Sequence, residues 1–150
     1  IVICVSRDAD VLEMVNTIKK YTNTDTIVVD TSTVSSETAA QAAAILEKAN
    51  THFLDCPVSG GTEGAKNGTL AMMVGGDEVI LEKVRSTLDS IAGNIVYIGP
   101  TGSGQATKAV NQIWSGDGLT HGKSRRYSFN RSSWQLVPGT PRQNYAGREL

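Results

Sequence analysis

Short apolar runs alternate with longer amphipathic segments over residues 1–113, and this alternation most constrains how the chain can fold. The apolar runs are rich in β-branched residues. They predict strands over residues 1–5, 26–30, 52–58, 70–74 and 94–98. Strands that alternate with helices of about a dozen residues are typical of an α/β fold, with a largely parallel sheet and flanking helices.

Polar residues at the starts of the amphipathic segments predict where the helices begin. Asp8 or Asp10 is expected to cap a helix that ends near Lys19 and Lys20. Ser35 is expected to cap an alanine-rich helix, and Asp77 a third helix. A fourth helical pattern begins near Gln105.

Composition excludes several classes of partner. The formal net charge of −1 argues against a general affinity for nucleic acid, and no apolar run is long enough to span a bilayer. His52 and His121 are isolated, so we expect no metal site. Cys4 and Cys56 lie within apolar runs and are expected to be buried free thiols. That usage favours a reducing compartment, either the cytoplasm or an organelle matrix.

The segment 114–150 differs in character from the rest of the chain. It holds six Lys or Arg residues and two Asp or Glu residues, and neither strand nor helix periodicity is present. We expect this tail to be mostly irregular or disordered. A basic arm that binds nucleic acid is the less favoured alternative.

The stretch from Asp55 to Ala71 contains a glycine-rich break that could bind an anion. An apolar run stops at Ser59-Gly60-Gly61, where backbone N–H groups are exposed with no side chain in the way. A carboxylate could lie directly against such a surface. A plain glycine-rich connection between two strands explains the same pattern.

A second stretch, residues 102–111, places polar side chains along one face of a helix. Gly104, Lys108 and Asn111 are separated by four and three residues, so they share a face. Gly104 would leave a gap in which a ligand could sit beneath the lysine. Lys108 could act there as a general acid or base, and Asn111 could hold a hydroxyl or carbonyl oxygen. An exposed lysine near a helix start is the alternative interpretation.

Together these two stretches resemble the β-hydroxyacid dehydrogenases. The matching motifs are Asp-x-Pro-Val-Ser-Gly-Gly-x-x-x-Ala-x-x-Gly-Thr-Leu at 55–70 and Gly-x-Gly-x-x-x-Lys-x-x-Asn at 102–111. The family includes 3-hydroxyisobutyrate dehydrogenase and, more distantly, 6-phosphogluconate dehydrogenase. Asp30-Thr-Ser-Thr33 matches a further family segment near the nicotinamide. The resemblance implies a partial Rossmann-like domain over residues 1–100, the start of an interdomain helix over 101–113, and an atypical tail over 114–150.

The resemblance also implies an activity and a set of site residues. It implies an oxidoreductase that uses NAD or NADP and transfers hydride between the nicotinamide and a small 3-hydroxy acid such as 3-hydroxyisobutyrate. Lys108 would exchange a proton with the substrate oxygen and Asn111 would orient the substrate. Three neighbouring residues would hold the substrate carboxylate: Ser59, Gly60 and Gly61. Four residues at strand ends would face the cofactor: Val5, Ser6, Ser32 and Thr33.

Two departures from the family pattern lead to further expectations. The glycine-rich fingerprint would precede Ile1, and residues after Ile113 do not resemble the family's helical domain. We therefore expect cofactor binding and turnover by this chain alone to be impaired. In the complete enzyme the resemblance implies a homo-oligomer. A non-catalytic Rossmann-like interaction module is the alternative function.

Overall fold

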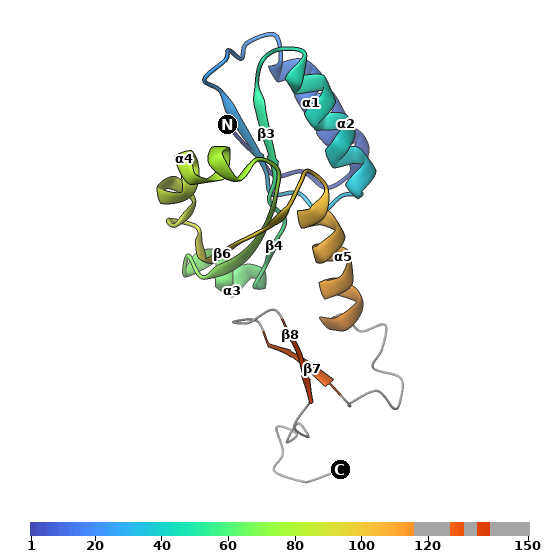
Figure 1. The fold of residues 1–150 in the computed structure, drawn as a ribbon, viewed down its shortest axis with the longest axis vertical. Coiled ribbons are helices and arrows are strands. Elements are labelled where there is room, and N and C mark those ends of the chain that lie inside the picture. The colour runs from blue at the N-terminus through green and yellow to red at the C-terminus, as the bar shows by residue number, and fades with distance from the viewer. Residues whose placement is uncertain (116–126, 131–134, 139–150) are drawn as a thin grey trace. The chain divides into compact units, whose positions relative to one another are not determined.

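The computed structural model describes residues 1–115, 127–130 and 135–138, with side chains up to residue 113. The chain divides into two compact units, Ile1–Gln112 and Ile113–Leu150 (Figure 1). The first unit carries every candidate site residue identified in the sequence. The finer division at residues 100 and 113 stays a prediction.

A six-stranded sheet forms the centre of the first unit. Its strands are β1 (Val2–Ile3), β2 (Ile27–Asp30), β3 (His52–Asp55), β4 (Val58–Ser59), β5 (Leu70–Gly75) and β6 (Ala92–Gly99). The β1–β2, β2–β3 and β5–β6 pairs are parallel, whereas β3 and β4 both pair with β5 in the antiparallel sense. The predicted α/β fold with a largely parallel sheet and flanking helices is confirmed.

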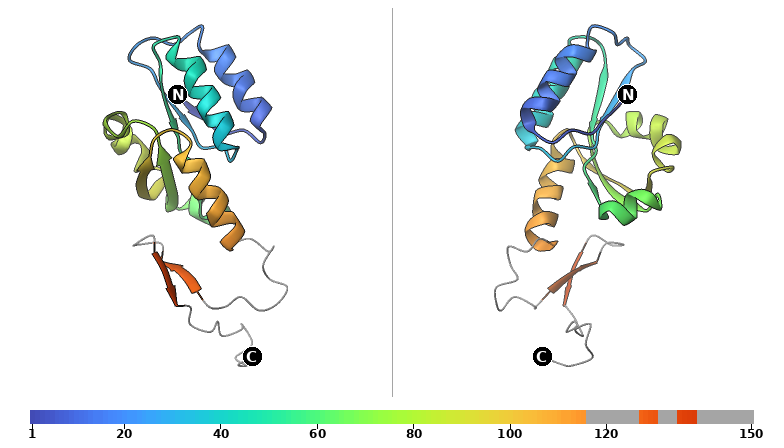
Figure 2. Two further views of the ribbon diagram at one scale, coloured as in Figure 1. Left: turned by 45° about the vertical axis from the view of Figure 1, so that its right-hand side comes forward. Right: turned by 180° about the vertical axis from the view of Figure 1, so that it is seen from behind.

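Helices cover both faces of this sheet, as the two views of Figure 2 show. On one face lie α1 (Asp8–Ile18), α2 (Ser36–Glu47) and α5 (Ser103–Ser115). On the other lie α3 (Gly61–Lys66) and α4 (Glu78–Leu88). Short connections bring each helix back onto the sheet, as expected for strands that alternate with helices.

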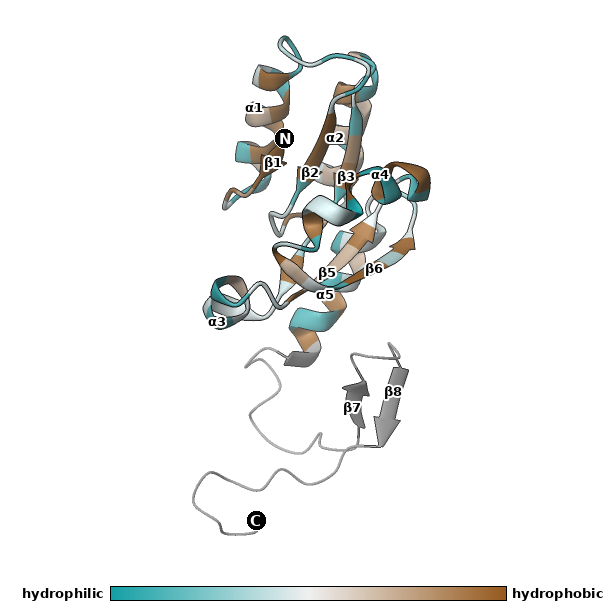
Figure 3. Ribbon diagram, turned by 90° about the vertical axis from the view of Figure 1, so that its left-hand side faces the viewer, coloured by the Kyte–Doolittle hydropathy of each residue, from teal (hydrophilic) through white to brown (hydrophobic). Residues whose placement is uncertain are grey.

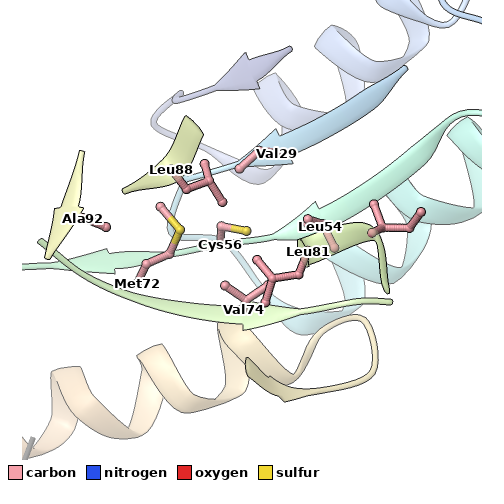
Figure 4. Close-up of a cluster of buried hydrophobic side chains, with 9 residues drawn as sticks. Val29, Leu54, Cys56, Met72, Val74, Leu81, Leu88 and Ala92 are labelled. Carbon is pink, nitrogen blue, oxygen red and sulfur yellow. The ribbon is translucent and has the colours of Figure 1, made fainter. Parts of the chain in front are cut away.

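Successive residues of the central strands face opposite sides of the sheet and so supply two hydrophobic cores. Val28 and Phe53 pack toward α1 and α2, whereas Val29 and Leu54 pack toward α4. The second core also contains Met72 and other buried side chains from β5 and α4 (Figure 4). In Figure 3 strands β1 and β2 are largely hydrophobic, whereas the helices mix hydrophobic and polar residues. Burial on both faces explains the continuous apolar runs of the sequence.

The predicted strand over residues 52–58 is interrupted. It divides into β3 and β4 at Cys56-Pro57, because proline has no N–H to donate to a sheet. The interruption stays tied to its neighbours, since Cys56 N–H donates to Asp30 O at 2.7 Å and Met73 N–H donates to Pro57 O at 3.0 Å. The following loop contains α3, a short helix. The sequence did not predict this helix, because glycine disfavours helical structure.

The first strand is less buried than its sequence suggests. Among the described strands β1 pairs with β2 alone, so its other edge is open. The β-branched apolar run over residues 1–5 is typical of a strand buried on both faces, but Val2 is 57% exposed. Cys4 is also exposed, so the expectation of a buried Cys4 was wrong. Cys56 is buried as expected, and burial raises the pKa of its thiol.

Asp8 acts on a different helix from the one predicted. Arg7 is the N-cap of α1, and in the described structure no side chain caps that helix. Asp8 Oδ1 instead accepts hydrogen bonds from Ser35 N–H at 3.0 Å and Thr38 Oγ1 at 2.6 Å, at the start of α2. Ser35 caps α2 as predicted, and its hydroxyl also donates to Asp8 Oδ1. The expectation that Asp77 caps a helix is likewise confirmed at α4, and α1 ends at Ile18, just before Lys19 and Lys20.

These hydrogen bonds predict a pH-dependent contribution of Asp8 to stability. Donors from Thr38 and Ser35 lower the pKa of Asp8 from 3.8 to about 2. Stabilisation is therefore complete above pH 3.8 and is lost as the pH falls toward 2. Thermal unfolding of Asp8→Asn should show a lower Tm than the unchanged chain at pH 7, and the difference should shrink through this window. Asp25→Asn, an exposed control, should match the unchanged chain; a Tm difference for Asp8→Asn that persists at pH 2 would contradict the assignment.

The second unit contains two described strands, β7 (Tyr127–Asn130) and β8 (Gln135–Pro138). They form an antiparallel pair in which Tyr127 is opposite Pro138. The expectation of no strand periodicity was wrong at β7, where Tyr127 and Phe129 alternate with Ser128 and Asn130. The rest of the expectation for residues 114–150 lies outside the described residues. No helix in the described part of the chain has both the length and the apolar character needed to cross a membrane.

Candidate active site at the start of helix α5

A buried carboxylate holds the first turn of α5 against the sheet. Asp55, at the end of β3, accepts hydrogen bonds from Gly102 N–H at 2.7 Å and Gln105 N–H at 3.0 Å. Both donors belong to the start of the helix, where backbone N–H groups lack partners within the helix. Burial raises the pKa of Asp55, and the two hydrogen bonds oppose that rise. Asp55 thus fixes where the helix that carries Lys108 begins.

Asp30 lies beside Asp55 in the sheet, because the two residues are partners in the β2–β3 register. It is fully buried, and its Oδ1 accepts from Ser32 N–H at 2.9 Å. Its Oδ2 has no hydrogen-bond partner within the described structure. Burial raises the pKa of Asp30, and the nearby Asp30 charge adds to the rise at Asp55. Two buried acids therefore lie side by side in the sheet, and one of them, Asp55, contacts the start of α5.

Gly104 does not leave a gap for a ligand, and that expectation was wrong. A Cβ atom added there would lie 2.5 Å from Met73 O and 2.7 Å from Asp55 O. The missing side chain lets α5 approach the backbones of β3 and β5 closely. The helical spacing nevertheless places Lys108 and Asn111 next to Val58 and Ser59 of β4.

Lys108 and Asn111 both contact the segment that begins at β4. Lys108 is 9% exposed, and its Nζ donates to Val58 O at 2.7 Å. Asn111 Nδ2 donates to the Ser59 hydroxyl at 3.3 Å. The interpretation of Lys108 as an exposed surface lysine is therefore wrong. Two stretches some fifty residues apart meet at this point, as their joint appearance in the sequence suggested.

The Ser59-Gly60-Gly61 segment forms a tight turn between β4 and α3. Gly60 has φ of 139° and Gly61 has φ of 62°, which favour glycine. A Cβ atom on Gly60 would lie 3.1 Å from the Leu70 side chain, whereas Gly61 faces open space. Both glycines are exposed and Ser59 is half-buried. Their backbone is accessible next to Asn111.

The four residues expected to face the cofactor lie at the carboxyl ends of β1 and β2. Val5 N–H donates to Ser32 Oγ at 2.9 Å, which joins the two strand ends. Ser32 is buried, whereas Ser6 and Thr33 are exposed. The structure therefore brings these residues together, while their role stays a prediction.

Sequence reasoning missed Gln105 and assigned Asp8 to the wrong helix. Asp30 and Asp55 lay within the quoted motifs but were given no role of their own. Both buried acids end apolar strand runs, where a charged residue has no obvious place on a sheet face. An acidic residue at the end of an apolar strand was therefore the feature of the sequence that could have identified Asp30 and Asp55 as functional residues. Gln105 carries no such signal, because one glutamine in a helix resembles any other. Among the residues that the structure describes, no group of three or more His, Cys, Asp or Glu side chains could hold a metal ion.

Comparison with known proteins identifies the family. Residues 1–99 match the NAD binding domain of 6-phosphogluconate dehydrogenase. The chain belongs to this family. Its relatives include an uncharacterized oxidoreductase of Synechocystis sp., which is 40% identical over 119 residues, or 77% of this chain and 41% of the relative. The predicted membership of the β-hydroxyacid dehydrogenase and 6-phosphogluconate dehydrogenase group is thus confirmed.

Solved members of the family have the same fold. The 3-hydroxyisobutyrate dehydrogenase of Mycobacterium tuberculosis, solved with L-serine, has a TM-score of 0.72 and 36% identity, covering 75% of this chain and 39% of that one. A complex named Psf3 with NADP⁺ and 2-OPP has a TM-score of 0.71 and 28% identity, covering 75% and 41%. The chain thus spans less than half the length of these relatives.

Proposed function

We propose that this chain is the catalytic dinucleotide-binding part of an NAD- or NADP-dependent 3-hydroxyacid dehydrogenase. Its substrate would be a small 3-hydroxy acid such as 3-hydroxyisobutyrate. The observation that carries the proposal is the meeting of Lys108 and Asn111 with the Val58–Ser59 segment. A helix that only joined two domains would not need a buried lysine at this position.

The strand ends next to this meeting point fit a nicotinamide cofactor. Ligands of α/β sheets bind outside the carboxyl ends of parallel strands. There Ser6 and Thr33 offer exposed hydroxyls and backbone groups, while Val5 and Ser32 join the strands beneath them. When bound, the nicotinamide would accept or supply the hydride. The relative solved with NADP⁺ supports this class of cofactor.

The Ser59-Gly60-Gly61 turn is the proposed site for the substrate carboxylate. Its exposed backbone lies beside Asn111, which donates to the Ser59 hydroxyl. The Mycobacterium tuberculosis relative was solved with L-serine, which carries a carboxylate and a hydroxyl on its third carbon. In a substrate of that class, a short carbon chain separates the hydroxyl from the carboxylate. With the carboxylate on the turn, the hydroxyl would lie toward Lys108.

Lys108 is the proposed proton carrier. During oxidation its neutral amine would take the proton of the substrate hydroxyl, and its ammonium would return a proton during reduction. Val58 O accepts from Nζ at 2.7 Å and so holds the lysine in place. The complete enzyme would be a homo-oligomer in the cytoplasm or an organelle matrix.

A chimera tests the proposal, because the relatives are longer than this chain. Residues 1–112 would replace the aligned segment of the Mycobacterium tuberculosis 3-hydroxyisobutyrate dehydrogenase. We expect NAD(P)H formation with 3-hydroxyisobutyrate, measured by absorbance. The methyl ester should have a kcat/KM at least about tenfold lower, because hydrogen bonds to a charged group contribute about 1.5–3 kcal/mol.

Each outcome of this experiment distinguishes a separate part of the proposal. Equal kcat/KM for the acid and its ester would contradict the carboxylate site. A folded chimera that binds NAD(P)H and yet forms no product would contradict the catalytic function and favour the interaction module.

A further inference from the structure

Gln105 joins α5 to the segment that follows β2. Its side chain is 2% exposed, and both ends of the amide are used. Nε2 donates to Ser32 O at 2.8 Å, and Oε1 accepts from Val34 N–H at 3.1 Å. One side chain therefore satisfies a backbone acceptor and a backbone donor two residues apart.

The helix end of this connection is itself fixed to the sheet. Gln105 N–H donates to Asp55 Oδ2 at 3.0 Å, and Ser36 Oγ donates to Gly102 O at 3.0 Å. Lys108 follows Gln105 by three residues, which is about one helical turn. The segment expected to face the nicotinamide and the proposed proton carrier are thus attached to one frame.

We propose that Gln105 is a positioning residue that sets the spacing between the Ser32–Val34 segment and Lys108. The inference rests on the proposed function, in which the hydride leaves the substrate toward the nicotinamide beside the Ser32–Val34 segment and the proton leaves toward Lys108. Their spacing affects the rate, since a misplacement of about 1 Å can cost about a hundredfold. Gln105 would act through the backbone of Ser32 and Val34 and would not touch the substrate.

The chemistry of the connection requires an amide or an equivalent group. Methionine matches the shape of glutamine but offers no comparable donor or acceptor, so Ser32 O and Val34 N–H would lose their partner. Ionised glutamate keeps the acceptor but places a charge against Ser32 O. A protonated glutamate again offers one donor and one acceptor. Glutamate at this position should therefore work only when it is neutral.

The first measurement is amide hydrogen exchange in the chain itself. Gln105→Met should reduce protection of the Val34 amide by at least about tenfold, because a bond to a buried group is lost. Amides in the interior of α2, such as that of Leu46, should keep their protection. The matched control is Gln112→Met, which changes an exposed glutamine of the same helix. It should leave Val34 unchanged.

The second measurement is steady-state hydride transfer in the chimera. Gln105→Met should lower kcat about a hundredfold while KM for NAD(P) and for the hydroxy acid changes less than threefold. The kcat of Gln105→Glu, divided by that of the unchanged chimera, should rise as the pH falls. The same ratio for Gln105→Met should not change with pH. The charged groups nearby are Asp55 of β3, Asp30 of β2 and Lys108 of α5, and they are present in every variant. A ratio to the unchanged chimera therefore removes their own titration.

The outcomes distinguish this inference from the proposed function. An active chimera whose kcat survives Gln105→Met overturns the positioning role alone. A loss of kcat together with deprotection of Leu46 also overturns it, since the residue would then only stabilise the fold. A folded chimera without hydride transfer overturns the proposed function, and the positioning role with it.

Discussion

Replacing Lys108 by methionine in the chimera is expected to lower kcat for hydride transfer by about 10²–10⁴-fold. That range is the usual contribution of a positioned general acid or base. Methionine is unbranched and can occupy the same buried position, so the helix should remain in place. NAD(P)H binding should change little, because the proposed cofactor contacts lie just beyond the carboxyl ends of β1 and β2.

The physical reason lies in the surroundings of Lys108. Its side chain is 9% exposed, and Nζ donates to Val58 O at 2.7 Å. Few other groups of the site could take over a proton, because the Asn111 amide does not titrate and Asp55 is already bonded to the helix. Water reaches a largely buried position poorly. Loss of the amine should therefore affect kcat far more than KM.

A second lysine provides the control for this experiment. Lys83 is exposed on α4, on the opposite face of the sheet. Lys83→Met should leave kcat and KM unchanged. Stopped-flow and steady-state absorbance at the NAD(P)H band would measure both variants. If Lys108→Met retained more than a tenth of the kcat, the assignment of Lys108 as proton carrier would fail.

The largest loss of stability is expected for Gly104→Ala. In an exposed helix, alanine would be favoured over glycine by about 1 kcal/mol. Here the added Cβ would lie 2.5 Å from Met73 O, 2.7 Å from Asp55 O and 2.8 Å from Asp55 Oδ2. Two of these three atoms are backbone, so they cannot move aside without distorting β3 or β5. We expect the free energy of unfolding to fall by at least about 2 kcal/mol despite the better propensity.

Chemical denaturation of the chain would measure this effect. Gln112→Ala changes an exposed residue of the same helix and should alter the free energy of unfolding by less than about 0.5 kcal/mol. A neutral or stabilising Gly104→Ala would show that α5 does not pack against the strands as closely as the structure has it. The same variant in the chimera should lose activity, because Lys108 lies on the displaced helix.

The main elements of the fold could be predicted from local patterns. Apolar runs such as 26–30 identify strands because a strand buried on both faces needs apolar residues on both. Ser35 identifies a helix start because its hydroxyl can bond locally, and it accepts from Thr38 N–H at 3.1 Å. The short helix α3 could not be predicted, since Gly61 and Gly64 disfavour a helix. It forms where Leu70 packs against its backbone.

The candidate site was predictable in part, through motifs and not through physics alone. The two motifs identified Ser59, Lys108 and Asn111, which the structure brings together. Their separation in the chain is about fifty residues, so no local pattern could place them in contact. Gln105 lay within the second motif and drew no attention. Its importance comes from two backbone partners at residues 32 and 34.

The sequence by itself determined the α/β class, the strand and helix order and the family, because these depend on periodicity and on motifs that are visible in the sequence. Only the tertiary structure decided which groups the individual residues contact. Asp8 caps the helix of Ser35 and not its own, Gly104 accommodates the sheet and not a ligand, and Cys4 is exposed just after β1. Each depends on a neighbour that is distant in the chain. Contacts of that kind follow from packing, which local propensity does not encode.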